Sequence, residues 1–231
     1  MGKGTKQLTA VATTVLLVLA LSSAAPAQVQ STFQFRYWGT PFIFTNGAAT
    51  GQNSASAFGL TVRGDSTTRP WGVSFRFDQV NATPTFWPWN RATLWDANLH
   101  YRFGSNLSNY WGLLAGYQRV SVTDPGTFNT GSGGGVRIGT DFRWQTTPGM
   151  GWYATGEAAY GFSWGSSFPS FPGLTSGTAT DYRVAVGYEF QGGIGLEAGY
   201  RQLRWNIPVS PGCGPCIFEF SGWTAALTVR K

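Results

Sequence analysis

Residues 178–206 read TATDYRVAVGYEFQGGIGLEAGYRQLRWN and contain two runs in which apolar and polar residues alternate. Tyr182 and Val184 share one parity of the sequence, while Asp181 and Arg183 share the other. Such alternation of apolar and polar residues is typical of a β-strand whose two faces meet different surroundings. A Gln-Gly pair then separates this run from a second alternating run, which predicts two antiparallel strands joined by a short turn.

The same alternation recurs along the chain after residue 30, where no helical period is sustained. One alternating run would be weak support for a strand, but a series with the same split between faces is strong support. The ten runs are approximately 31–38, 54–63, 71–80, 92–103, 109–122, 134–146, 150–164, 178–190, 193–206 and 217–230.

The connections between these runs alternate in length. The first is long (39–53), the second is short (64–70), and the alternation continues to the end of the chain. A transmembrane β-barrel has this property, because its periplasmic turns are short and its external loops are long. We therefore expect an all-β, antiparallel transmembrane barrel of about ten strands. Eight strands is the alternative if the first two runs, which are short or rich in small residues, are irregular.

Composition agrees with a chain that is surrounded by lipid. Only 11% of the 231 residues are charged and 16% are aromatic, whereas soluble domains carry about 25% charged residues. The aromatic content excludes a disordered chain. The mean hydropathy of −0.12 argues against a helical membrane protein.

The N-terminus has the features of an export signal. Lys3 and Lys6 precede an apolar run from Val11 to Leu21, and Ala25-Pro-Ala27 supplies a small-residue cleavage pattern. The apolar run is too short to cross about 30 Å of hydrocarbon as a helix. We expect residues 1–27 to be a cleaved signal peptide and residues 28–231 to form one barrel domain. The remaining charge is only mildly basic, so we expect no nucleic-acid partner.

Aromatic residues near the strand ends predict two interfacial girdles, since amphipathic rings prefer the headgroup level. The girdle on the short-turn side comprises Trp71, Phe103, Trp111, Trp144, Trp152 and Phe190. The girdle on the long-loop side comprises Trp95, Phe162, Trp164, Tyr182 and Phe218.

With these runs, the chain resembles the small bacterial outer-membrane β-barrels of the OmpA-type and OmpX-type superfamily. The resemblance covers residues 28–231 and lies in pattern rather than in a signature motif. It implies insertion in the outer membrane of a diderm bacterium, with outer-membrane lipid as a partner. One departure concerns the last run, Trp223 to Lys231, which lacks the terminal aromatic residue that commonly acts as an assembly signal in such barrels.

If the apolar parity faces lipid, the polar parity faces the lumen. The basic residues expected inside are Arg36, Arg63, Arg76, Arg102, Arg137, Arg143, Arg183 and Arg201. The acidic residues expected inside are Asp78, Asp96, Asp141, Glu157, Asp181, Glu189 and Glu197, and His100 accompanies them. This near balance predicts a salt-bridged plug rather than an ion-selective pore. Neighbouring strands should bring Arg76 near Asp96, and reversing both charges should preserve folding better than reversing either one.

Candidate reactive residues are few. His100 is the only histidine and lies in neither an H-x-S nor a D-x-H pattern, so we interpret it as a polar lumen residue. Cys213 and Cys216 are the only cysteines, in a loop rich in Pro and Gly. In an exported protein they predict a local disulfide rather than a redox site. We expect no catalytic residue, no metal site and no cofactor.

These features favour a non-enzymatic membrane protein with a structural or surface-interaction role. Its long loops carry aromatic residues that could contact an external ligand or a cell-surface partner, or dip into lipid headgroups: Trp87, Trp89, Phe128, Phe168 and Phe171. A narrow channel for small solutes is one alternative. A membrane-embedded lipid-modifying enzyme is another, although no cluster of nucleophile and base is visible in the sequence.

Overall fold

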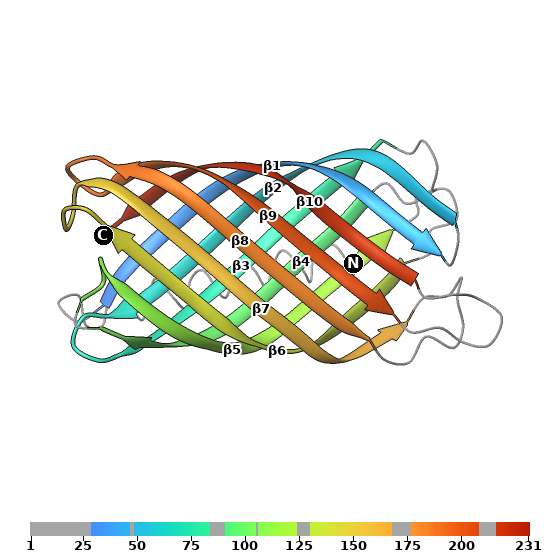
Figure 1. Ribbon diagram of the computed structural model, residues 1–231, viewed down its shortest axis with the longest axis horizontal. Helices are drawn as coiled ribbons and strands as arrows, with labels where there is room; N and C mark the ends of the chain where they lie inside the picture. The colour runs from blue at the N-terminus through green and yellow to red at the C-terminus, as the bar shows by residue number, and fades with distance from the viewer. Residues whose placement is uncertain are drawn as a thin grey trace, which may run out of the picture.

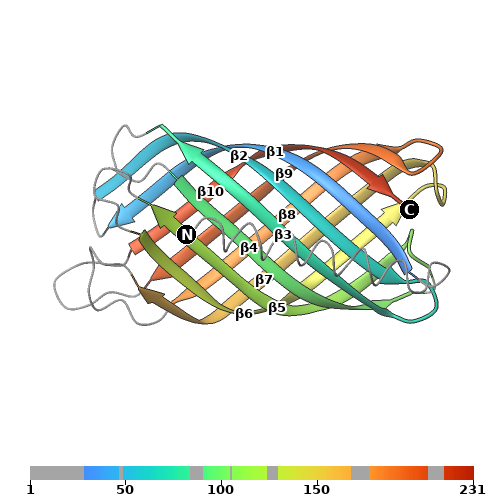
Figure 2. The same ribbon diagram turned by 180° about the vertical axis from the view of Figure 1, so that it is seen from behind.

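The computed structural model describes residues 29–46, 49–83, 91–104, 106–123, 130–167, 177–207 and 216–231. Ten antiparallel strands form one closed barrel, which Figures 1 and 2 show from opposite sides. The strands are β1 (Val29–Asn46), β2 (Ala49–Ser66), β3 (Trp71–Ala82), β4 (Arg91–Phe103), β5 (Tyr110–Thr123), β6 (Thr130–Gln145), β7 (Gly151–Ser167), β8 (Thr178–Glu189), β9 (Ile194–Ile207) and β10 (Cys216–Arg230). The predicted ten-stranded antiparallel barrel is confirmed, and the eight-stranded alternative is wrong.

Closure leaves the sheet without a free edge. Every strand pairs with its neighbours in sequence, and β1 also pairs with β10, from Thr32 opposite Arg230 to Asn46 opposite Cys216. Backbone hydrogen bonds of 2.8 and 2.9 Å join Ser31 and Lys231 in both directions beside this seam. Full closure is the arrangement that satisfies the backbone of a sheet in hydrocarbon. Within the described ranges, no helix is long and apolar enough to cross a membrane.

The barrel has two distinct ends. The terminal end carries Val29 and Lys231 together with the connections 67–70, 104–109, 146–150 and 190–193. The loop end carries the other five connections, most of whose residues lie outside the described ranges. In Figure 1 the C-terminus lies at the terminal end, and the strands run to the loop end at a marked tilt.

The first hairpin differs from the expectation. The sequence predicted runs 31–38 and 54–63 with a long connection, whereas β1 and β2 extend to Asn46 and Ala49 and only residues 47–48 join them. The region 39–53 is rich in Gly, Ala and Asn and includes Pro41, so its strand propensity is low. Pairing decides instead, because β1 is hydrogen-bonded to β2 on one side and to β10 on the other.

The outer wall is apolar and ends in exposed aromatic side chains. At the terminal end the side chains of Trp111, Trp144 and Trp152 are 51–59% exposed, and the rings of Phe103 and Trp111 stack at 4.9 Å. At the loop end Tyr182 also points outward. Phe218 was assigned to this girdle wrongly, because it is 1% exposed and faces the interior. The side chain of Trp164 lies outside the described residues.

Candidate functional site

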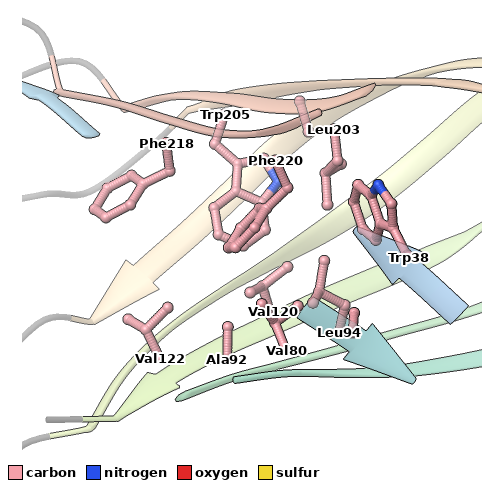
Figure 3. Close-up of a cluster of buried hydrophobic side chains, with 12 residues drawn as sticks. Trp38, Val80, Ala92, Leu94, Val120, Val122, Leu203, Trp205, Phe218 and Phe220 are labelled. Atoms are coloured by element: carbon pink, nitrogen blue, oxygen red, sulfur yellow. The ribbon is translucent and has the colours of Figure 1, made fainter. Parts of the chain in front are cut away.

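An apolar layer fills the interior of the barrel near the loop end. Its members are buried side chains from eight strands: Trp38, Ala57, Val80, Ala92, Leu94, Val120, Val122, Ala179, Leu203, Trp205, Phe218 and Phe220. Figure 3 shows Trp205 and Phe220 directed toward Val80 and Val120 on the facing wall. Burial of this kind stabilises at about 25 cal/mol per Å² of apolar surface. The layer therefore places packed apolar side chains in the lumen near the loop end.

A central network of charges lies next to this layer. It connects four arginines with four carboxylates from β1, β3, β4, β6, β7, β8 and β9: Arg36, Arg76, Asp78, Asp96, Arg137, Glu157, Asp181 and Arg201. Arg36 reaches Asp78 at 2.5 Å, Arg201 reaches Asp78 at 2.6 Å, and Arg137 reaches Glu157 at 2.5 Å.

The central network is almost dry. The side chains of Arg36, Arg137 and Arg201 are 0% exposed, and those of Asp78 and Asp181 are 1–2% exposed. Removing charges from water costs several kcal/mol per ion, so each must be compensated by close partners. A guanidinium group meets this need by presenting several N–H donors in one plane. Here single guanidinium groups bridge carboxylates from different strands, which cross-links the barrel wall from inside.

Arg76 shows how the network departs from a simple pair. It lies directly opposite Asp96 in the β3–β4 register, but the nitrogen–oxygen distance is 3.7 Å. Its nearer partners are Glu157 at 2.5 Å and Asp181 at 3.4 Å, from strands across the lumen. Local pairing thus places Arg76 beside Asp96, whereas closure of the barrel supplies its stronger contacts.

The remaining predicted lumen charges lie toward the terminal end. Arg183 pairs with Glu197 and Arg143 with Glu189, each at 2.6 Å. Arg102 pairs with Asp65 at 2.7 Å.

Two lumen charges were missed by the sequence analysis. Asp65 is 7% exposed and also binds Arg63 at 2.7 Å, and Arg230 reaches Glu189 at 3.4 Å. Both lie near strand ends, where a run of alternating residues no longer defines the parity. Strand β2 extends to Ser66, past the predicted end at residue 63, and this extension turns Asp65 inward.

A chamber lies between the central network and the terminal end. It has a volume of about 120 Å³, which is room for a few water molecules. Its wall alternates cationic and anionic groups: Arg63, Arg76, Arg143, Arg183 and Arg230 with Asp65, Asp141, Glu157, Glu189 and Glu197. Ser74, His100 and Tyr110 also line it.

His100 makes contacts in this chamber that sequence spacing could not reveal. Its Nε2 lies 2.8 Å from Ser74 Oγ, and its Nδ1 lies 3.3 Å from Asp141 Oδ2 without the alignment of a hydrogen bond. His100 is 2% exposed, which places it inside the lumen wall. Ser74 lies on the adjacent strand, but Asp141 comes from β6, and only the barrel brings the three together.

The other predicted sites stay predictions. Cys213 and the side chain of Cys216 lie outside the described residues, as do the aromatic residues of the long loops. Among the residues that the structure describes, no group of three or more His, Cys, Asp or Glu side chains is arranged to hold a metal ion.

Comparison with known proteins gives likeness in fold alone. No family model matches the sequence, and no curated protein matches it. Among solved structures, the outer membrane protease OmpT from Escherichia coli superimposes with a TM-score of 0.54 at 13% identity, covering 89% of this chain and 97% of that one. The Pseudomonas putida toluene transporter TodX gives a TM-score of 0.31 at 9% identity, covering 91% of each chain. Pseudomonas aeruginosa OpdL gives 0.20 at 7% identity, covering 88% of this chain and 98% of that one.

Such identities carry over no activity. The closed antiparallel topology, the apolar outer wall and the superposition on OmpT agree with one another. The chain has the fold of the bacterial outer-membrane β-barrel proteins.

Proposed function

We propose that this chain is an integral outer-membrane protein whose barrel is sealed against the passage of solutes, with a structural or surface-interaction role. The apolar layer is the main support for a sealed barrel, because its twelve buried side chains occupy the interior beside the loop end. The central network adds a second, charged obstruction next to it. In this proposal the chain belongs with the OmpA-type and OmpX-type barrels, and its role requires no catalytic residue.

Export and location belong to the same proposal. Cleavage of residues 1–27 would deliver the barrel to the outer membrane of a diderm bacterium, where the apolar wall meets lipid. The outward rings at both ends, such as Trp144 and Tyr182, support this placement, because such rings prefer the headgroup level. An external ligand or a cell-surface partner would be met by the long loops.

The narrow channel is the competing function, and the chamber is the observation in its favour. Single-channel recording in planar bilayers separates the two. The sealed barrel predicts no conductance steps from the wild-type protein. A triple variant, Trp38→Ala with Trp205→Ala and Phe220→Ala, removes the largest rings of the apolar layer while leaving the charges in place. Reproducible steps from the wild-type protein that grow in the triple variant would show passage through the lumen and contradict the proposal.

A further inference from the structure

Three side chains of the chamber have the arrangement of a nucleophile, a base and an orienting carboxylate. Ser74 on β3 lies 2.8 Å from His100 Nε2 on β4, and His100 Nδ1 lies 3.3 Å from Asp141 Oδ2 on β6. Each ring nitrogen of the imidazole therefore faces a different partner, a hydroxyl on one side and a carboxylate on the other. Ser74 is only partly buried and lines the chamber, so its hydroxyl borders free volume.

We propose that Ser74 is a nucleophile activated by His100, that Asp141 is its positioning residue, and that the chamber accepts the acyl group of a small ester. A serine hydroxyl is a weak nucleophile until a base within hydrogen-bond reach takes its proton. The Oγ–Nε2 distance meets this requirement. A serine–histidine–carboxylate site is recognised by the distances between its three side chains and by what each one does, whatever their order in the sequence.

The surroundings hold the orienting carboxylate in place. Asp141 Oδ2 accepts a hydrogen bond from Arg63 at 2.7 Å and one from the Tyr110 hydroxyl at 3.4 Å. Two contacts from β2 and β5 thus fix the carboxylate that faces the imidazole. The carboxylate thereby places a fixed negative charge 3.3 Å from Nδ1, where it stabilises the imidazolium that forms when Nε2 takes the proton.

A hydrogen-bond donor and a positive charge also lie close to the Ser74 hydroxyl. Asn98 Nδ2 donates to Ser74 Oγ at 3.3 Å, and Arg76 lies two residues along β3 on the same inward face, where it too lines the chamber. Donors and cations placed before the reaction stabilise the oxyanion that forms at an attacked carbonyl. The small volume limits the reacting acyl group to a short chain.

The proposed reaction is acyl transfer to water. Ser74 Oγ forms a bond to the acyl carbon, its proton passes to His100 Nε2, and that proton leaves with the released alcohol as the ester bond breaks. Water then attacks the acyl-serine, giving its proton to His100, and Ser74 regains a proton as the carboxylic acid departs. No oxidant, metal or further reactant is needed. The reaction does not depend on whether the apolar layer seals the barrel, because the chamber lies between that layer and the terminal end.

The test combines covalent labelling with turnover by the full barrel in detergent micelles. Methanesulfonyl fluoride is small and modifies an activated serine by forming an O–S bond as fluoride leaves, and peptide mass spectrometry locates the adduct. Hydrolysis of 4-nitrophenyl acetate measures acyl transfer. The wild-type protein should be sulfonylated at Ser74 and should hydrolyse the ester. Ser74→Ala should reduce hydrolysis to the micelle background, and His100→Gln should lower the labelling rate by about 10²–10⁴-fold, the usual contribution of a general base.

Controls separate chemistry from folding. Each variant is first checked for the faster gel migration of the unheated barrel. Ser121→Ala, which removes an outward-facing hydroxyl near the loop end of β5, should retain wild-type rates. Asp141→Asn should slow labelling and Asp141→Glu should restore part of the rate, since a carboxylate that only stabilised the fold would leave labelling of the folded fraction unchanged. A folded wild-type protein that is not labelled at Ser74, or one labelled equally fast in His100→Gln, would overturn the proposal.

Discussion

The guanidinium carbon of Arg201 lies 5.0 Å from the centroid of the Trp38 ring. The same guanidinium binds Asp78 at 2.6 Å and Asp181 at 2.9 Å. Arg201 is thus the point at which the apolar layer meets the central network. A cation against an aromatic face contributes about 0.5–2 kcal/mol, and the two carboxylates compensate the buried charge.

Replacement of Arg201 by methionine should destabilise the barrel strongly. Loss of the cation leaves Asp78 and Asp181 with less compensation in a dry interior, and breaking a buried pair from one side costs about 3–5 kcal/mol. Urea unfolding in lipid vesicles measures the change in free energy. Arg119→Met is the matched control, since Arg119 is exposed on the outer side of β5 and should change stability by no more than about 0.5 kcal/mol. Equal effects of the two variants would show that the central network contributes little.

Charge swaps should distinguish an isolated pair from a shared one. Arg183 binds Glu197 at 2.6 Å, and among the described residues no second carboxylate lies within 4.0 Å of its guanidinium. We expect Arg183→Glu combined with Glu197→Arg to recover stability lost by each single change, with a coupling of about 0.5–3 kcal/mol in double-mutant cycles.

The swap at Arg76 and Asp96 should behave differently. The sequence alone predicted that reversing both charges would preserve folding better than reversing either one. However, the reversed residue at position 76 would face Glu157 and Asp181, and an arginine at position 96 would face Arg137. The double variant should therefore recover little of the loss. Full recovery at this pair would contradict the shared network.

In the turn between β8 and β9, alanine should be tolerated better at position 192 than at position 193. Gly192 and Gly193 have φ values of 93° and 81°, a region that costs other residues roughly 1–2 kcal/mol. An added Cβ at Gly192 meets nothing within 4 Å, but one at Gly193 would lie 2.2 Å from the carbonyl oxygen of Arg230. Gly193→Ala should cost more than Gly192→Ala by urea unfolding, because the clash adds to the strain. Equal costs would mean that the turn is not held against β10.

A charge on the lipid-facing wall should be costly according to its depth. Val184 is 53% exposed near the middle of β8, and arginine at the midplane of a bilayer costs about 2–4 kcal/mol in such barrels. Gln191→Arg, in the turn that follows, should cost about 0–1 kcal/mol. Unfolding from vesicles compares the two variants. If Val184→Arg is no worse than Gln191→Arg, position 184 does not face hydrocarbon.

The sequence predicted the barrel because alternation persists wherever one strand face meets lipid. The sequence-based prediction failed where the difference in polarity between the two strand faces is small. At the loop end of β9, Gln202 and Arg204 point outward while Leu203 and Trp205 point inward, so polarity there opposes the rule that apolar residues face lipid. The apolar layer was missed for this reason, and Phe218 was placed on the wrong side.

The chamber contacts were beyond sequence reasoning for a different physical cause. Ser74 and His100 lie on adjacent strands, where register alone brings them together. Asp141 reaches them from β6, and that contact depends on barrel closure and on the inward reach of side chains. A search for closely spaced catalytic motifs finds none of the three.

If lipid surrounds this barrel while its lumen is filled, an accessibility scan of β8 will distinguish the two faces of the strand. Spin labels are placed singly at Val184, Ala185 and Val186 in vesicles, in a background with Cys213 and Cys216 replaced by serine. We predict that oxygen, which concentrates in lipid, relaxes labels at Val184 and Val186, that the label at Ala185 is shielded, and that a water-soluble nickel complex reaches none of them. Relaxation of the labels at Val184 and Val186 by the nickel complex as strong as that of a label at Gln191 in the turn would contradict the account.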